Sequence, residues 1–511
     1  MLAKIRSSAV VGVDARPVTV EVDISYGLPG FATVGLAEGA VRESRERVKA
    51  AIKNSGYDFP NRRITVNLAP ADLKKEGTGY DLPIALGILT AAEILSSAKL
   101  ASYGVTGELS LDGSTRPAKG ILPMAIAARN NGLEGILVPL ANAEEAAVVS
   151  GIKIIGVKTL YEAVEFLAGT RELHPRSIDL DAVFQDNTDY GVDFDEVRGQ
   201  EHVKRAMEIA AAGGHNILMK GPPGAGKTMM ARRLPTILPD LTFDEALETT
   251  KIYSVMGLMQ GRTPLVTTRP FRAPHHTISD AGLIGGGQVP RPGEVSLAHN
   301  GVLFLDESHE FKKNVLEVLR QPLEDGMVTI SRATGSLSFP SRFMLVIAFN
   351  PCPCGYLGDM KHSCRCTTAQ VQRYESRLSG PLLDRIDMHL EVPSVPYSKM
   401  AAAQKGVPSA VIKEKVERAR KRQKERFAGR HHYHSNGQMT PRDIKAFCAL
   451  DRASEKLIEN AVERLGLSAR SYHRILKIGR TIADLDWSES VQAAHIAEAV
   501  QYRRFEGSME N

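Results

Sequence analysis

The chain lacks several features that would place it outside the ordinary globular proteins. No apolar run within its 511 residues approaches the length of a membrane span. The first residues carry no signal-peptide core or cleavage site, and no internal repeat or long low-complexity segment follows them. The five cysteines, without an export signal, argue against a disulfide framework. These absences disfavour membrane-spanning and disulfide-rich secreted proteins, and we expect a cytoplasmic protein without a membrane partner.

The composition is that of a soluble globular protein with several domains. Hydrophobic residues make up 43% of the chain and charged residues 24%. The length suggests about two to four domains. A formal net charge of +5 and a pI near 8.8 permit nucleic acid as a partner without requiring it.

The most informative stretch matches the phosphate-binding motif G-x-x-x-x-G-K-[ST] at every fixed position. An apolar run precedes it and a run that can start a helix follows it, which is the strand–turn–helix context that the motif needs. The glycines let backbone N–H groups close around phosphates at the positive end of the helix. The lysine is expected to reach the β- and γ-phosphates of ATP, and the threonine to bind Mg²⁺. The candidate residues are Gly221, Pro222, Pro223, Gly224, Ala225, Gly226, Lys227 and Thr228.

A second apolar run ends in two carboxylates, Asp306 and Glu307. Such a run predicts a central parallel strand that delivers acids to its carboxyl end, where open α/β sheets bind ligands. Asp306 is expected to hold Mg²⁺, and Glu307 to polarise the attacking water as general base. Together with the phosphate-binding motif, the pair predicts ATP hydrolysis.

Three parts can be distinguished along the chain. Residues 1–170 alternate strand-like and helical runs, and residues 171–190 form a polar, turn-rich linker. Residues 191–395 contain the ATPase core, for which we expect an α/β fold with a parallel sheet. Residues 396–511 are mostly helical. In the first part we predict strands over 18–24, 63–68 and 135–139, and helices over 38–54, 83–94 and 121–130.

The core resembles the AAA+ ATPases of the magnesium-chelatase-like branch. Residues 195–201 look like the family's segment near the adenine, and Asn350 ends an apolar run where the family has its sensor-1 residue. Residues 380–387 resemble the arginine-finger segment, with Arg385 as the finger. Residues 466–470 resemble the start of the sensor-2 helix, with Arg470 facing the γ-phosphate. The resemblance implies that Asn350 orients water and that Arg385 completes a neighbour's site in a homo-hexameric ring. Which subunit's γ-phosphate Arg470 meets stays open.

Two predicted hairpins narrow the branch. Residues 270–299 look like the inserted hairpin of the chelatase clade, and residues 328–339 read as a second hairpin. In DNA-translocating relatives such hairpins project into the pore of the ring. Arg332 is a candidate DNA-phosphate contact. A charge that faces water is an equally good interpretation of this residue alone.

The first 170 residues resemble the Lon-protease-like domain of the ribosomal-protein-S5 domain-2 type. The resemblance rests on residues 75–83 and 107–113. The places of the family's catalytic Ser and Lys hold Gly79 and Leu122, which can act neither as nucleophile nor as base. We therefore expect a non-proteolytic α+β domain that serves as a scaffold or a DNA-guiding collar.

Four of the five cysteines form a C-x-C pair, a nine-residue gap and a second C-x-C pair. Such a set can surround one Zn²⁺ with four thiolates, and His362 could replace one sulfur. The alternative is free or redox-sensitive thiols. The His275–His276 pair reads as part of a solvated loop. The candidate zinc ligands are Cys352, Cys354, Cys364 and Cys366.

Residues 413–430 carry nine basic and three acidic side chains on a predicted helix. Such a run is either a solvated helical face or, in a ring ATPase, a surface for the DNA backbone. Both interpretations stay open. The candidate DNA contacts are Arg420, Lys421 and Lys424.

Over nearly its whole length the order of these parts resembles the YifB/ComM family. The resemblance implies ATP-driven branch migration on single-stranded or branched DNA in homologous recombination during natural transformation. A recombinase or other recombination proteins are then candidate partners. Two alternatives are a metal-chelatase-type motor subunit and a protein-remodelling or regulatory AAA+ ATPase.

Overall fold

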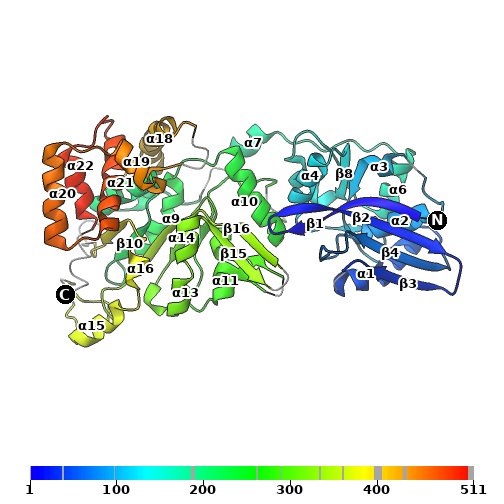
Figure 1. The fold of residues 1–511 in the computed structure, drawn as a ribbon, viewed down its shortest axis with the longest axis horizontal. Helices are drawn as coiled ribbons and strands as arrows, with labels where there is room; N and C mark the ends of the chain where they lie inside the picture. The colour runs from blue at the N-terminus through cyan, green and yellow to red at the C-terminus, as the bar shows by residue number, and fades with distance from the viewer. Residues whose placement is uncertain are drawn as a thin grey trace. The chain divides into compact units, whose positions relative to one another are not determined.

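The computed structural model describes residues 2–36, 39–96, 98–185, 190–259, 263–287, 289–332, 335–359, 362–395, 406–429 and 434–503. The chain divides into two compact units (Figure 1). The first unit joins residues 1–188 to residues 242–267, and the second joins residues 189–241 to residues 268–511. The chain therefore leaves the second unit after Leu241 and returns to it at Thr268.

The first unit is built on a seven-stranded sheet with the order β3-β4-β2-β1-β5-β8-β9. β1 pairs antiparallel with β2 and parallel with β5, so the sheet is mixed. Alternating apolar residues of β2 and β4 are buried, because one face of this sheet meets the core. The strands are β1 (Leu2–Val11), β2 (Asp14–Ser25), β3 (Gly30–Val34), β4 (Arg63–Ala69), β5 (Tyr103–Val105), β8 (Gly135–Pro139) and β9 (Lys153–Val157), with a separate pair β6 (Glu108–Leu109) and β7 (Thr115–Arg116).

Helices of the first unit begin and end close to the predicted bounds. The predicted helix over 121–130 is α4, and the one over 38–54 is α1. The helix predicted over 83–94 ends earlier, because Glu93 adopts a left-handed φ of 62°. The helices are α1 (Gly39–Asn54), α2 (Asp81–Ala91), α3 (Lys99–Ser102), α4 (Ile121–Asn130), η1 (Leu140–Asn142), α5 (Ala143–Ala147), α6 (Leu160–Ala168), α7 (Leu180–Gln185) and α10 (Phe243–Met256).

Helix α10 lies in the first unit although its sequence falls between elements of the ATPase core. The Ser254 hydroxyl bonds the buried Glu145 carboxylate, and the Ser254 carbonyl accepts from Gly120 N at 2.9 Å. Lys251 adds an ion pair with Asp14 at 3.0 Å. Burial raises the pKa of Glu145, and the Ser254 hydroxyl partly offsets this. Residues 242–267, within the range expected for the core, thus pack with the first unit.

The second unit is built on a five-stranded parallel sheet with the order β11-β14-β17-β10-β18, which confirms the expected α/β architecture. Every residue of β14 and β17 is buried, as expected for strands covered on both faces. The strands are β10 (Ile217–Lys220), β11 (Phe271–Arg272), β14 (Val302–Leu305), β17 (Met344–Phe349) and β18 (Met388–Glu391).

Two antiparallel pairs stand outside this sheet. β15 (Met327–Arg332) and β16 (Gly335–Pro340) form the hairpin predicted over 328–339. Among the described residues of 270–299, where a hairpin was predicted, β12 (Gly285–Gly286) pairs antiparallel with β13 (Arg291–Pro292) over two residues. The short helices that flank this pair are α11 (Asp280–Ile284) and α12 (Glu294–Leu297).

Helices complete the second unit and make up its C-terminal part. α8 and α9 share one buried core with α18, α21 and α22. The helices are η2 (Phe194–Glu196), α8 (Glu201–Gly213), α9 (Lys227–Ile237), η3 (Ser308–Glu310), α13 (Lys313–Glu317), α14 (Arg320–Asp325), α15 (Thr368–Glu375), α16 (Gly380–Leu383), α18 (Ser409–Arg426), η4 (Asn436–Gln438), α19 (Pro441–Phe447), α20 (Arg452–Leu465), α21 (Ala469–Leu485) and α22 (Ala493–Gln501). Within the described part of the chain, no helix combines the length and apolarity needed to span a membrane.

Candidate functional site: the nucleotide site and its surroundings

The phosphate-binding motif forms the turn between β10 and α9. Gly226 adopts a left-handed φ of 87° and caps the start of α9, so the first N–H groups of this helix are directed at the turn. A Cβ on Gly221 would lie 2.1 Å from the carbonyl oxygen of Val392, so only glycine fits where the turn leaves the sheet. Lack of space therefore requires glycine at position 221, and the left-handed backbone favours it at position 226.

The Lys227 ammonium lies over this turn and is mostly buried. Its Nζ donates to the carbonyls of Gly221 at 2.7 Å and Pro222 at 3.0 Å, and to Asn350 Oδ1 at 3.1 Å. Burial lowers the pKa of Lys227, while the charges of Asp306 and Glu307 act in the opposite direction. Asn350, which follows the end of β17, is therefore brought to the same point as Lys227, the lysine of the motif.

Asp306 and Thr228 meet at the carboxyl end of the sheet. The Thr228 hydroxyl donates to Asp306 Oδ2 at 2.6 Å. Hydroxyl and carboxylate oxygens are the ligands that Mg²⁺ prefers in nucleotide sites, so the two side chains fit the ion that ATP brings. Thr228 lies in the first turn of α9, which follows β10, and Asp306 follows the end of β14. In the sheet, β17 lies between β10 and β14.

Glu307 follows Asp306 with a left-handed φ of 48°, an uncommon conformation for a residue with a side chain. Its side chain is 62% exposed, and the imidazole Nδ1 of His276 lies 4.0 Å from Glu307 Oε2. His276, interpreted from sequence as solvated, lies beside the candidate base.

Arg385 and Arg470 lie at the opposite end of the sheet from the phosphate-binding turn. β18 runs parallel to β10 with Ile217 opposite Met388, so residues that precede Met388 lie at the amino end of both strands. The phosphate-binding turn follows Lys220 at the carboxyl end. A four-residue strand separates the two ends by about 10–13 Å.

Both arginines are held by acidic side chains of their own unit. Arg385 pairs with Glu324, and its side chain is 11% exposed. Arg470 Nη1 donates to Asp384 Oδ2 at 3.1 Å, and its side chain is 67% exposed. Glu324 and Asp384 are partners that the sequence could not identify, since Glu324 stands on α14, 61 positions before Arg385.

A buried ionic network holds the C-terminal helices against the amino end of β18. Arg474 pairs with Asp387. Burial by itself raises the pKa of the Asp387 carboxyl, but Arg474 and His215 lower it by more. The pKa of Asp387 therefore lies below its usual range. The fully buried Asp484 accepts from Arg426 and from Arg480 Nη2 at 3.0 Å. The Arg474–Asp387 pair therefore joins α21, which also carries Arg470, to the segment that carries Arg385.

The hairpin β15–β16 has one apolar and one polar face. Val328, Ile330 and Phe339 are buried, whereas Arg332 is exposed at the end of β15. Ile330 packs beside Gly285 of the β12–β13 pair, and Arg332 approaches Gly286. The two hairpins thus lie together, with Arg332 at their exposed end. The tip residues 333–334 fall outside the described residues.

The basic helix α18 uses most of its charges inside the second unit. Arg420 donates to the carbonyls of Ala211 at 3.0 Å and His434 at 2.7 Å, and Arg418 and Arg422 cover the ring of Trp487. Arg420 therefore anchors the helix and is a poor DNA contact. Lys421 and Lys424 are exposed.

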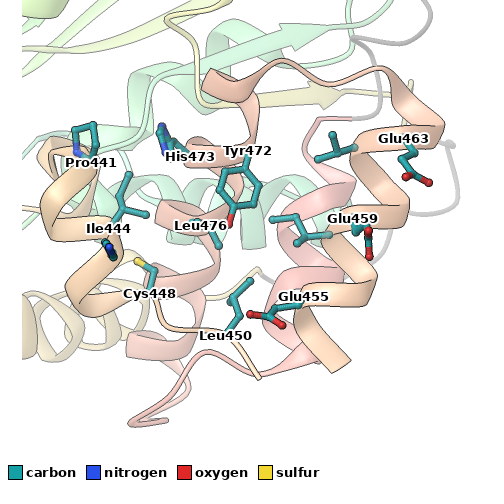
Figure 2. Close-up of a pocket in the computed structure, with 13 residues that line it drawn as sticks. Pro441, Ile444, Cys448, Leu450, Glu455, Glu459, Glu463, Tyr472, His473 and Leu476 are labelled. Carbon is teal, nitrogen blue, oxygen red and sulfur yellow. The ribbon is translucent and has the colours of Figure 1, made fainter. Parts of the chain in front are cut away.

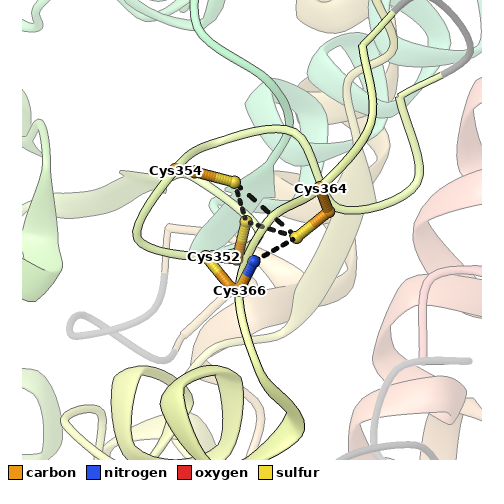
Figure 3. A group of neighbouring side chains, drawn as sticks. All are labelled: Cys352, Cys354, Cys364 and Cys366. Atoms are coloured by element: carbon orange, nitrogen blue, oxygen red, sulfur yellow. Dashed lines mark hydrogen bonds between the residues drawn. The ribbon is translucent and has the colours of Figure 1, made fainter.

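The four candidate zinc ligands come together after β17 (Figure 3). The Sγ of Cys352 lies 3.3 Å from that of Cys354 and 3.6 Å from that of Cys364, and all four sulfur atoms lie within 4.8 Å of one another. Four sulfurs around a tetrahedral zinc, each at about 2.3 Å from the ion, are separated by about 3.7 Å. His362 instead bonds Asp359 at 2.8 Å, so the cluster is complete without it.

A separate groove of about 770 Å³ lies between α19, α20 and α21 (Figure 2). Its floor is apolar, with Ile444, Leu450 and Leu476, while Glu455 and Glu459 stand along one side. None of its lining residues belongs to the phosphate-binding turn, the acidic loop or the cysteine cluster.

In the first unit, Leu122, which the sequence resemblance aligns with the protease lysine, is fully buried. Gly79, which the resemblance aligns with the nucleophile, accepts at its carbonyl from Gly107 N at 2.9 Å. Among nearby serines, Ser110 accepts from Arg116 and Ser114 donates to Asp112 at 2.7 Å.

Comparison with known proteins agrees with this arrangement. Three family models match in succession: "Subunit ChlI of Mg-chelatase" over residues 20–142, "Magnesium chelatase, subunit ChlI" over 193–400, and "Magnesium chelatase, subunit ChlI C-terminal" over 406–503. Competence protein ComM of Haemophilus influenzae is 45% identical over 98% of this chain and 97% of its own length. Uncharacterized protein YifB of Escherichia coli is 44% identical over the same shares. Magnesium-chelatase subunit ChlI of Euglena gracilis is 24% identical over 39% of this chain and 58% of its own length.

Proposed function

Because this chain belongs to the YifB/ComM family of magnesium-chelatase-like ATPases, we propose that it is an ATP-driven, hexameric DNA motor. It would migrate branches on forked or single-stranded DNA during homologous recombination. The name of the Haemophilus relative, a competence protein, supports a role in natural transformation.

The chemistry proposed for one subunit is the hydrolysis of ATP. The N–H groups of the turn and the Lys227 ammonium bind the phosphates, and Asn350 and Glu307 orient and polarise the attacking water. Thr228 and Asp306 would hold Mg²⁺, which neutralises phosphate charge when it is bound. Glu307 is suited to the role of base because its carboxylate is exposed beside the phosphate-binding turn.

One observation supports the proposal of a hexameric ring. Arg385 and Arg470 lie at the end of the sheet opposite their own phosphate-binding turn. Neither can reach the nucleotide of its own subunit across the length of β18. Arg470 donates to Asp384, the residue directly before Arg385. We therefore propose that Arg385 and Arg470 serve the same nucleotide of the neighbouring subunit. For Arg470, whose subunit the sequence left open, the proposal is therefore the nucleotide of the neighbour.

DNA is the proposed substrate because the paired hairpins expose Arg332 beside a polar face, which suits the sequence-independent contacts of a motor. The chelatase alternative is weaker, since the chelatase subunit matches 39% of this chain whereas ComM matches 98%. A recombinase or other recombination proteins remain candidate partners. A motor on chromosomal DNA would work in the cytoplasm.

We propose the domain division 1–170, 171–190, 191–395 and 396–511, with α10 attached to the first domain. Leu122 and Gly79 replace the protease lysine and serine, so the first domain is proposed to be non-proteolytic. A scaffold or a collar that guides DNA fits this loss of catalytic groups.

We further propose that the four clustered cysteines hold one Zn²⁺. The sulfur atoms already lie at separations close to those of a tetrahedral thiolate site. All five cysteines are unpaired by disulfides, which leaves the thiols available to a metal.

The proposal is tested by ATPase rates with and without DNA, in the wild type beside Glu307→Gln, followed by strand displacement on a three-stranded branched substrate. We expect DNA to stimulate the ATPase and displacement to require ATP. Glu307→Gln should bind ATP and DNA but lose turnover and displacement. Lys227→Ala serves as the control that loses nucleotide binding itself.

An ATPase that is indifferent to DNA and displaces nothing would overturn the motor. Turnover that depends on a porphyrin would then support the chelatase alternative. Stimulation by protein alone would support a remodelling or regulatory ATPase.

A further inference from the structure

The segment between β17 and α16 holds the cysteine cluster and helix α15, and it touches the nucleotide site from two sides. We propose that the metal-bound cluster is a clamp that holds residues 352–375 against the phosphate-binding turn and the acidic loop, so that loss of the metal weakens ATP binding. This inference rests on the zinc and nucleotide sites proposed above, and assigns the metal a role in the affinity for ATP.

The first contact is between the cysteine loop and the phosphate-binding turn. Gly355 follows Cys354 directly, has a left-handed φ of 84°, and closes a turn through its N–H to the Cys352 carbonyl at 2.9 Å. A Cβ on Gly355 would lie 2.7 Å from Cδ and 2.8 Å from Cγ of Pro223. The loop backbone therefore rests directly on the turn that binds phosphate.

The second contact is made by helix α15, which begins immediately after the last cysteine of the cluster. Thr367 caps the helix and forms a capping box with Gln370. At the other end, Glu375 pairs with Lys220 at 2.9 Å, and both side chains are largely shielded from solvent, at 22% and 18% exposed. Lys220 is the residue before Gly221, so this ion pair is made at the entrance to the phosphate-binding turn.

The third contact reaches the acidic loop. The ring of Tyr374 stacks on His309, with centroids 4.2 Å apart and planes 9° from parallel. His309 is fully buried, also contacts the ring of Phe349 at 4.6 Å, and stands two residues after Glu307. Arg377 donates to the His309 carbonyl. The segment thus contacts both the turn that binds phosphate and the loop that carries the candidate base.

Few side chains of the segment are buried. Between residues 356 and 377 the Asp359 side chain is 6% exposed and bonds His362 and Ser394, whereas α15 contributes no buried residue. A helix of eight residues is too short to be stable by itself. A metal that joins Cys352 and Cys354 to Cys364 and Cys366 closes this loop and limits the freedom of the helix that follows.

The test compares Cys364→Ser with Cys448→Ser in the full-length protein. Cys448 is buried at the end of α19 and lies outside the cluster, so it is a matched control. The measurements are zinc content, equilibrium binding of a non-hydrolysable ATP analogue without DNA, and hydrogen exchange of residues 217–228 and 306–310. Cys364→Ser should lose zinc, bind the analogue about tenfold more weakly, and exchange faster in both segments, because the stack and the ion pair are loosened. Cys448→Ser should retain all three properties.

Two further measurements keep the test decisive if Cys364→Ser folds poorly. Chelation of the wild type followed by addition of zinc should lower and then restore analogue binding. The double variant Tyr374→Ala with Glu375→Gln should keep its zinc yet bind the analogue as weakly as the metal-free protein.

The possible outcomes distinguish failure of the proposed clamp from failure of the proposed zinc site and from failure of the proposed DNA motor. A stoichiometric zinc whose removal leaves analogue binding unchanged would overturn the clamp while the zinc site and motor stand. Wild-type protein purified without zinc, with analogue binding insensitive to chelator, would overturn the metal site and the clamp together. Failure of DNA to stimulate the ATPase would affect only the motor, since the clamp is measured without DNA.

Discussion

Arg470 donates to Asp384, the residue beside Arg385, at the amino end of β18. One hydrogen bond of 3.1 Å thus joins the C-terminal helix α21 to the arginine-finger segment. The phosphate-binding turn lies at the other end of the sheet. Both guanidinium groups therefore lie away from the phosphate-binding turn of their own chain, which is the basis for the proposal that they serve a neighbouring subunit.

This relationship predicts that the ATPase can be restored by mixing two inactive variants. Arg385→Ala and Glu307→Gln should each lose turnover by about 10³-fold or more, because an arginine finger contributes about that much. In mixed rings, an Arg385→Ala subunit keeps an intact Glu307 and can receive Arg385 from its neighbour. The ATPase rate of the mixture, measured against each variant alone, should therefore recover partly.

The same mixing with Arg470→Ala in place of Arg385→Ala should also recover activity. If Arg470 acted on its own subunit's nucleotide, the mixture with Glu307→Gln would contain no complete site and would stay inactive. Mixing Lys227→Ala with Glu307→Gln is the negative control, because both changes affect the same side of the site.

A second prediction concerns the DNA surface. Arg332→Glu should weaken binding to single-stranded DNA and reduce the slope of log affinity against log salt by about 1, since one phosphate contact is lost. The double charge reversal Lys421→Glu with Lys424→Glu should leave the slope unchanged, because the other charges of α18 serve the fold. The opposite pattern would move the DNA surface from the hairpin to the helix.

Sequence reasoning located the elements well where apolar periodicity is strong. The strand predicted over 63–68 is β4, and the helix predicted over 121–130 is α4. For 270–299 it indicated a hairpin but not its extent: the antiparallel pair is two residues long and is flanked by short helices, because loops of this kind are shaped by the elements around them. It also gave no sign that α10 packs with the first unit through Ser254 and Glu145, a contact between positions 109 apart.

The residues of the candidate site also fall into two groups: those that a sequence motif predicts and those that it does not. The motif predicts residues such as Lys227 and Asp306 because phosphate and magnesium chemistry require them at a fixed spacing. The partners that hold the surrounding segments follow no such spacing. Tyr374 on His309 and Glu375 on Lys220 became visible only when the fold brought α15 onto the carboxyl end of the sheet.

A third prediction concerns the attachment of the C-terminal helices. Asp484→Ala should destabilise the second unit by about 3–5 kcal/mol, because it leaves the largely buried Arg426 and Arg480 without their carboxylate. Asp486→Ala is a matched control, since that carboxylate is 46% exposed and its pair with Arg205 should contribute about 0–1 kcal/mol. Urea denaturation followed by circular dichroism measures both. Equal effects of the two changes would contradict the importance of the buried network.

The last prediction uses the acid sensitivity of His309. Burial, with the nearby charges of Arg377 and Lys220, lowers the pKa of His309 to about 3, from an ordinary value of 6.5. Below pH 6.5, His309 is protonated in the unfolded chain but stays neutral in the folded protein. The stability that this residue contributes is therefore present above pH 6.5 and is lost as the pH falls toward 3. Each pH unit in this window costs at most about 1.4 kcal/mol of folding stability.

The test compares the wild type with His309→Phe, which keeps a ring against Tyr374 but cannot titrate. Between pH 7.5 and about 5.5, the melting temperature of the wild type should fall by a few degrees more than that of His309→Phe. The buried His389, whose pKa burial also lowers, remains in both proteins and cancels in the comparison. Parallel pH profiles for the two proteins would show that the His309 stack on Tyr374 tolerates a proton, contrary to this account.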